Sequence, residues 1–118
     1  MRNGFTLTEL LVVLSIAAIT AAIATPRLIG IADSAAVRDE TLRIVGAVDA
    51  ARGAAIRLGD VVTLSITTAN GVTMSGAGQP ITFGPAGLGM GVSNRTITLS
   101  KGTALRRIVV SKLGRLTY

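Results

Sequence analysis

The chain has 118 residues, which allows one small globular domain beside any membrane segment. It contains no cysteine, histidine or tryptophan, so disulfides, thiolate or imidazole metal sites and the usual side chains of acid–base chemistry near neutral pH are excluded, and we expect no enzyme, cofactor or metal site. The net charge is +6, with all six acids in the first 60 residues and six bases but no acid from Val61 to Tyr118, which indicates either an anionic partner or a cationic surface that keeps the domain soluble.

The first predicted element is an apolar helix from Phe5 to Thr25. These 21 residues carry a single charge, on Glu9. At 1.5 Å per residue the helix is long enough to cross a hydrocarbon layer about 30 Å thick. Arg2 and the α-amino group precede it, so the positive-inside rule predicts a cytoplasmic N-terminus.

Three interpretations of this segment compete. A secretory signal peptide has a shorter apolar run and a small-residue cleavage site at its far end; the triplet Ala22-Ile23-Ala24 is a loose match, but the helical pattern continues past it. A simple signal anchor explains the length and the basic flank. It does not explain Glu9, because a carboxylate about one turn inside lipid is costly and indicates a function and a partner. The third interpretation is a segment that assembles with copies of itself.

The stretch from Gly4 to Leu14 resembles the class III prepilin signal of type IV pilins and type II secretion pseudopilins. In that family a prepilin peptidase cuts after the glycine and methylates the new N-terminal residue. The resemblance implies cleavage between Gly4 and Phe5, N-methylation of Phe5, and a role for Glu9 in subunit assembly, through the α-amino group of a neighbouring subunit. Such a buried pair would fix the register, because a one-residue slip leaves both charges unpaired. Pro26 lies where many pilins have a helix-bending proline.

The resemblance also implies partners and a location. The partners are prepilin peptidase, other pilin or pseudopilin subunits and the bacterial inner membrane, with the final location in an extracytoplasmic pilus or a periplasmic pseudopilus. The predicted organisation is a leader peptide (1–4), a transmembrane and assembly helix (5–26), an amphipathic helix (27–59) and a globular head (60–118).

After Pro26 the pattern remains helical and becomes amphipathic. Apolar or small residues recur at three- and four-residue spacing, and most charged residues fall off this stripe. Asp39 and Arg43 form an i,i+4 pair on the solvated face. The stripe consists of Val37, Thr41, Ile44, Val45, Val48, Ala51, Ala55 and Leu58.

These signals predict one long helix, with a kink at Pro26, from about Phe5 to Leu58. Asp33 or Ser34 is suited to cap a restart of the helix, and Gly59 is suited to end it.

Beyond Gly59 the period changes to two, which predicts short strands. Asn70-Gly71 predicts a tight turn, and the glycine-rich stretch from Gly84 to Gly91 predicts a mobile loop. Of the two aromatic residues in this part we expect one in the core and one at an edge. The predicted strands lie around 62–66, 72–74, 81–83, 96–99, 107–110 and 116–118. The fold class is therefore α+β: a pilin-like lollipop whose long helix packs on a small antiparallel sheet.

The last forty residues resemble the GspH/FimT family of minor pilins and pseudopilins. The resemblance is carried by the run Ile81-Thr82-Phe83-Gly84 with Gly87, by Ile97-Thr98-Leu99, and by the basic run from Arg106 to Leu116 with its Gly114-Arg115 pair. The lack of a cysteine loop fits this family better than it fits many major pilins. The implied function is that of a minor type IV pilin subunit; the alternative is a GspH-like pseudopilin of a type II secretion system.

FimT-type minor pilins are implicated in DNA uptake, so the resemblance implies a DNA contact by Arg115. Arg106, Arg107 and Lys112 are further candidates because they are near it in sequence. Bases without aromatic or base-reading neighbours predict binding that is driven by phosphate, independent of sequence and sensitive to salt. Alternation along a strand places Arg106 and Arg107 on opposite faces. The alternative for these bases is an edge strand that resists aggregation.

Overall fold

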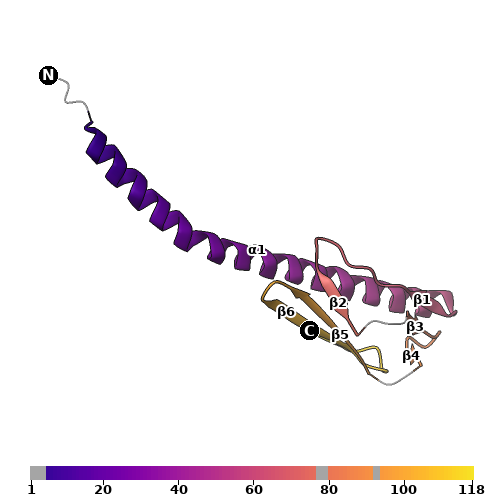
Figure 1. Cartoon of the computed structure of the whole chain (residues 1–118). Helices are drawn as coiled ribbons and strands as arrows, with labels where there is room; N and C mark the ends of the chain where they lie inside the picture. Colours follow the sequence, from indigo (N-terminus) through magenta and orange to yellow (C-terminus); the bar gives the residue numbers. More distant parts are fainter. Residues whose placement is uncertain (1–4, 77–79, 92–93) are drawn as a thin grey trace. The chain divides into compact units, whose positions relative to one another are not determined.

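The computed structural model describes residues 5–76, 80–91 and 94–118. Within them the chain forms one long helix, α1 (Leu7–Leu58), followed only by short strands (Figure 1). It divides into two compact units, Met1–Ala32 and Asp33–Tyr118. The strands are β1 (Val62–Leu64), β2 (Thr73–Ser75), β3 (Ile81–Phe83), β4 (Gly89–Met90), β5 (Arg95–Lys101), β6 (Ala104–Val110) and β7 (Leu116–Thr117).

The described part of the first unit is the apolar beginning of α1. An 18-residue stretch of this helix has a mean hydropathy of 2.2, and none of it is buried. Three of its hydroxyl groups, on Ser15, Thr20 and Thr25, donate to carbonyls of the same helix. Ser15 Oγ donates to Leu11 at 2.8 Å and Thr25 Oγ1 to Ala21 at 2.7 Å. An exposed apolar helix whose polar side chains turn back on the backbone is suited to lipid. This helix is long and apolar enough to cross a membrane.

The helix has the predicted length but does not restart. It runs unbroken through Asp33 and Ser34, so the expectation of a cap there is wrong. One proline removes a single backbone donor, and the helix continues past Pro26, which lies inside it; a kink at Pro26 stays a prediction. The stop at Gly59 is confirmed: its φ is +64°, and its N–H donates to the carbonyl of Ala55 at 3.0 Å.

The amphipathic stripe of α1 forms one side of the core. Leu58, which we expected on the stripe, is 72% exposed, because the helix extends beyond its last buried residue, Ala55. Glu40, which we did not expect there, is 2% exposed. The buried residues of the helix are Val37, Glu40, Thr41, Ile44, Val45, Val48, Ala51 and Ala55.

The strands form two antiparallel sheets rather than the single one expected. One has the order β1-β3-β4 and the other the order β2-β5-β6-β7. Both contribute to the same core, which the helix stripe completes. Phe83 is fully buried in this core and Tyr118 is exposed, as expected for the two aromatics. The other buried strand residues are Ile81, Ile97, Leu99, Ile108 and Val110.

The turn at Asn70-Gly71 is confirmed, but the strands beside it do not pair with each other. Both residues have positive φ (57° and 69°), and Val72 N–H donates to the carbonyl of Ala69 at 3.1 Å, as in a type I′ turn. β1 pairs with β3, and β2 pairs with β5, so this turn lies in a connection between the two sheets.

The stretch from Gly84 to Gly91 is partly ordered as a strand. Gly89 and Met90 form β4, which pairs with β3, and Gly84 N–H donates to the carbonyl of Leu88 at 2.9 Å. The expectation of a loop is therefore wrong for these two residues. The glycines permit a tight reversal with positive φ at Gly87.

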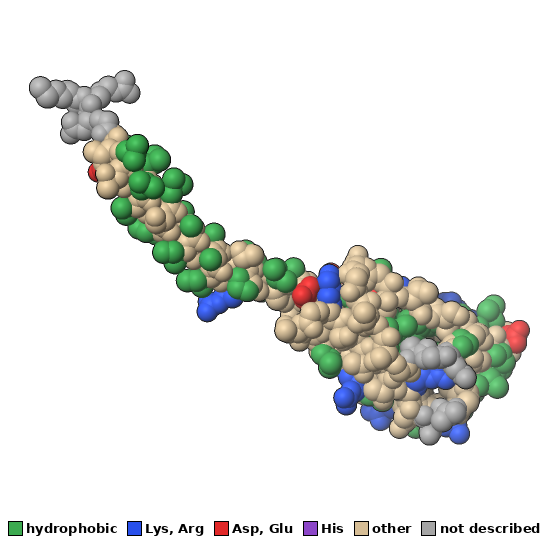
Figure 2. Space-filling view, viewed as in Figure 1, with side chains coloured by type: hydrophobic (Ala, Val, Ile, Leu, Met, Phe, Trp, Pro, Cys, Tyr) green, Lys and Arg blue, Asp and Glu red, His purple; other side chains and the backbone are tan. Residues whose placement is uncertain are grey.

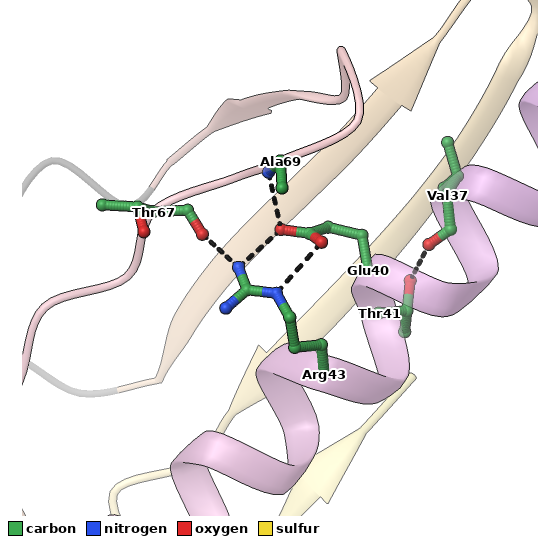
Figure 3. A network of polar contacts seen from close by, with 6 residues as sticks. All are labelled: Val37, Glu40, Thr41, Arg43, Thr67 and Ala69. Atoms are coloured by element: carbon green, nitrogen blue, oxygen red, sulfur yellow. Dashed lines mark hydrogen bonds and ion pairs between the residues drawn. The ribbon is translucent and has the colours of Figure 1, made fainter.

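A buried carboxylate attaches the 65–72 connection to the helix (Figure 3). Glu40 Oε1 accepts from Arg43 Nη2 at 2.6 Å and from Ala69 N–H at 3.2 Å, and Arg43 also donates to the carbonyl of Thr67. We had expected Arg43 to pair with Asp39, and this is wrong. Arg43 pairs with Glu40, because Glu40 faces the connection. The hydrogen bond from Arg43 lowers the pKa of Glu40, with burial acting in the opposite direction. This contribution to stability is present above the unfolded pKa and is lost as the pH falls through the folded one.

Candidate functional site

The side chain of Glu9 caps the helix on which it lies. Its Oε2 accepts from Thr6 N–H at 2.9 Å and from Thr6 Oγ1 at 3.0 Å, while Thr6 Oγ1 accepts from Glu9 N–H at 3.3 Å. This reciprocal arrangement is a capping box, with Thr6 as the N-cap. It explains why α1 begins at Leu7 rather than at Phe5.

The capping box does not depend on the leader peptide. Cleavage between Gly4 and Phe5 would keep the amide of Thr6, since that amide joins Phe5 to Thr6. Gly4 lies outside the described residues, and Phe5 is 79% exposed. Both Thr6 bonds use Oε2, so Oε1 of Glu9 makes no bond to a described residue and is open to an intermolecular donor.

The sequence carries the signature of this cap, which was not among the predictions above. The pattern is Thr or Ser, two residues, then Glu or Gln before an apolar run, and Thr6 to Glu9 fits it. The sequence-based interpretation of Glu9 considered only its cost in lipid and a contact with a neighbouring subunit. The structure gives the carboxylate a second, local role at the end of the helix.

The four basic candidates do not form a single cluster. Arg106 and Arg107 lie in β6, where Arg106 shares its face with the buried Ile108 and Arg107 points to the opposite face, beside Thr98 of β5. Lys112 and Arg115 belong to the turn after β6, which Ser111 N–H closes by donating to the carbonyl of Arg115 at 2.9 Å. Five extended residues span on the order of 15 Å, so Arg107 and the turn are separate contact points along one strand.

All four candidates are available for an anion. Arg106, Arg107, Lys112 and Arg115 are exposed, and none makes an ion pair or side-chain hydrogen bond with a described residue. By contrast, Lys101 lies 3.8 Å from Asp33, and Arg95 donates to the carbonyl of Pro80 at 3.0 Å. Figure 2 shows Lys and Arg side chains on the surface of the sheet-bearing unit.

Two glycines from the C-terminal resemblance pack against one arginine of the helix. Arg52 Nε donates to the carbonyl of Gly87 at 3.1 Å. Gly114 has a φ of +74°, and a Cβ there would lie 2.6 Å from Arg52 Nε and 2.9 Å from the Gly87 oxygen. A Cβ at Gly87 would lie 2.7 Å from Cδ1 of Ile56 and 3.3 Å from Arg52 Nε. The Gly114-Arg115 turn therefore packs closely against α1.

Among the described residues there is no group of three or more carboxylate, imidazole or thiol side chains that could hold a metal ion. The carboxylates that accept hydrogen bonds are Glu9, which caps the helix, Glu40, which attaches the 65–72 connection, and Asp60, which accepts from Val61 N–H at 2.6 Å.

One family matches this chain, the prokaryotic N-terminal methylation motif, over residues 1–25. No curated protein and no solved structure was found to match. The match covers the junction between Gly4 and Phe5, the capped Glu9 and the apolar helix. The match supports a class III prepilin signal in a type IV pilin-like protein, and such a signal implies processing by prepilin peptidase and assembly with other pilins.

Proposed function

We propose that this protein is a minor subunit of a type IV pilus or related filament, of the GspH/FimT type. The observation that carries the proposal is the N-terminal segment: an exposed apolar helix, an exposed Phe5 beyond its cap, and a Glu9 carboxylate with one oxygen unengaged. An apolar helix alone would support only an anchor. A carboxylate at the first turn of that helix supports specific contact with another subunit, because an unpaired charge among apolar helices is costly.

The small cysteine-free second unit supports the minor-subunit assignment. Its two short sheets and one helix stripe make a single core. The runner-up is a pseudopilin of a type II secretion system, which shares the N-terminal signal. Deleting the gene and scoring piliation and DNA uptake against protein secretion separates the two machines.

Processing at Gly4 is the first testable consequence. When the chain is produced with a prepilin peptidase, intact-mass spectrometry should show a product that lacks residues 1–4 and begins with N-methylated Phe5. Gly4→Val should block cleavage, because the side chain hinders approach of the peptidase to the bond. Asn3→Ala, one residue away, is the control and should be cut normally. A full-length product with the wild-type sequence would contradict the proposal.

We further propose that the basic residues of the second unit contact the phosphate backbone of DNA. Four exposed bases lack ion-pair partners among the described residues, and residues 61–118 contain no acid. With Arg107 on one face of β6 and Lys112 and Arg115 in the following turn, the contacts would be spread along a backbone. Neither described aromatic of this unit offers a stacking platform, since Phe83 is buried and Tyr118 is a single exposed ring.

This contact should weaken with salt and with loss of each base. Full-length protein in non-ionic detergent is titrated with duplex DNA at several salt concentrations and analysed by gel retardation. The slope of log K against log salt is negative, and Arg107→Ala and Arg115→Ala should each reduce its magnitude by about 1. Arg38→Ala removes the same charge from an exposed position of α1 and should leave the slope unchanged. Binding that ignores both salt and the two variants rules out the phosphate mechanism.

A further inference from the structure

The apolar first unit contains one acid and one base in its described part. Between Phe5 and Ala32 the only charged residues are Glu9 and Arg27. Neither has an ion-pair partner among the residues that the structure describes. Glu9 is engaged by Thr6 through Oε2 alone. The capping box gives Glu9 a role within the subunit, but it gives none to Arg27.

The two charges lie on the same face of the helix. They are 18 positions apart within α1, and 18 residues make about five turns of 3.6 residues and about 27 Å of rise. Each lies in a shallow groove on the helix surface, of the kind into which the side-chain ridge of a neighbouring helix packs. The groove at Glu9 is completed by Phe5, Thr8, Val12 and Val13, and the groove at Arg27 by Thr20, Ile23, Ala24 and Leu28.

A membrane does not require these charges to meet. A separation of about 27 Å is close to the hydrocarbon thickness of about 30 Å, so Glu9 and Arg27 can lie at opposite borders of the bilayer at the same time. The situation changes when apolar helices pack against each other without headgroups or water. Each charge then faces apolar side chains and is costly unless the neighbouring helix supplies the opposite charge.

We infer that a second copy of the chain packs in parallel, displaced by about five turns, so that Arg27 of one copy contacts the Glu9 carboxylate of the next. The inference rests on the proposed function of filament assembly and adds a register to it. The apolar helix carries both complementary charges itself, which identifies the occupant as another copy. An in-register parallel pair would instead place two carboxylates together, and an antiparallel pair would require two copies inserted in opposite directions.

This displaced contact does not close into a symmetric dimer, because each copy keeps one unpaired charge. The first copy keeps an unpaired Glu9 and the second keeps an unpaired Arg27, so further copies add at either end. The Glu9 cap is compatible with it, because Oε1 remains available while Oε2 accepts from Thr6. A carboxylate has about four acceptor positions. Contact with Arg27 of one neighbour therefore leaves room for the amino group of a different neighbour.

Cysteine cross-linking tests this register directly, because the chain has no cysteine of its own. Two differently tagged full-length copies are produced together, one with Val12→Cys and the other with Gly30→Cys, again 18 positions apart. A Cβ at Gly30 meets nothing within 4 Å in the subunit. The displaced packing brings these positions to disulfide distance, so we expect a mixed disulfide in the sedimented filaments. The pair with Val12→Cys in both copies should not cross-link.

Dependence on Arg27 distinguishes the ion pair from chance proximity. Arg27→Gln should lower the yield of the mixed disulfide by at least about tenfold, as expected when one partner of a desolvated charge pair is removed. Arg27→Lys should retain it, and Arg38→Gln, beyond the apolar unit, should have no effect. Filaments that form with an in-register disulfide, or with none, overturn the register. A mixed disulfide that persists in Arg27→Gln overturns the ion pair. Neither outcome contradicts the proposed function. A wild-type chain that forms no filaments with other pilins present overturns the proposed function as well.

Discussion

Replacing Glu9 by leucine should abolish incorporation of the chain into filaments and leave its insertion into the membrane intact. The substitution removes the only acid of the apolar unit, which is the group proposed to accept from a neighbouring subunit. Insertion should persist because the segment becomes more apolar, and losing a helix cap costs only about 1 kcal/mol. The measurement compares the sedimentable filament fraction with the membrane fraction that resists carbonate extraction.

Two variants separate the charge of Glu9 from its role as a cap. Glu9→Gln keeps an oxygen that can accept from Thr6 N–H, since glutamine also serves in a capping box, but it removes the charge. Thr6→Ala removes the capping hydroxyl and leaves the carboxylate. If assembly depends on charge, Glu9→Gln fails like Glu9→Leu and Thr6→Ala assembles. Filaments formed normally by Glu9→Leu would contradict the assembly role altogether.

Features encoded by neighbouring residues could be predicted from the sequence. The apolar helix, the stop at Gly59 and the turn at Asn70-Gly71 each depend on a few consecutive positions, and the structure confirms them. The helix stripe was also predicted closely, because burial on one face of a helix follows the 3.6-residue period. The prediction that Leu58 is buried was wrong, because periodicity does not reveal where the sheets stop covering the helix.

Features that depend on distant partners could not be predicted in this way. Arg43 is within one turn of both Asp39 and Glu40, and spacing alone favoured Asp39. The 65–72 connection favours the pair with Glu40, because the amide of Ala69 donates to Glu40 and the carbonyl of Thr67 accepts from Arg43. For the same reason the strands beside Asn70-Gly71 were not assigned to different sheets: their partners, β3 and β5, lie later in the chain.

The roles of Gly87 and Gly114 also depend on residues that are distant in sequence. The resemblance drew attention to Gly87 and Gly114 without giving either a physical role. In the structure both lie against Arg52, a residue that belongs to the helix and had been placed off its buried stripe. Arg52 and the carbonyl of Gly87 therefore account for the glycine at position 114, whereas Ile56 is the nearest neighbour of a side chain at position 87.

Replacing Gly114 by alanine should lower the free energy of unfolding of the second unit by about 2–4 kcal/mol. A residue with a side chain is strained at the φ of +74° found here, and the new Cβ would lie 2.6 Å from Arg52 Nε and 2.9 Å from the carbonyl oxygen of Gly87. Backbone strain contributes about 1–2 kcal/mol and overpacking about 1–3 kcal/mol. The measurement is a urea titration of the full chain in non-ionic detergent, followed by circular dichroism.

Gly53→Ala is the matched control, with an effect of the opposite sign. Gly53 lies inside α1, and a Cβ there would meet nothing within 4 Å. Alanine at such a position should raise the free energy of unfolding by about 0.5–1 kcal/mol, because it restricts the unfolded chain and favours the helix. The same methyl group thus stabilises one position and destabilises the other. Equal effects of the two substitutions would contradict both the positive φ of Gly114 and its packing against Arg52, because these two features make the added methyl group costly at this position.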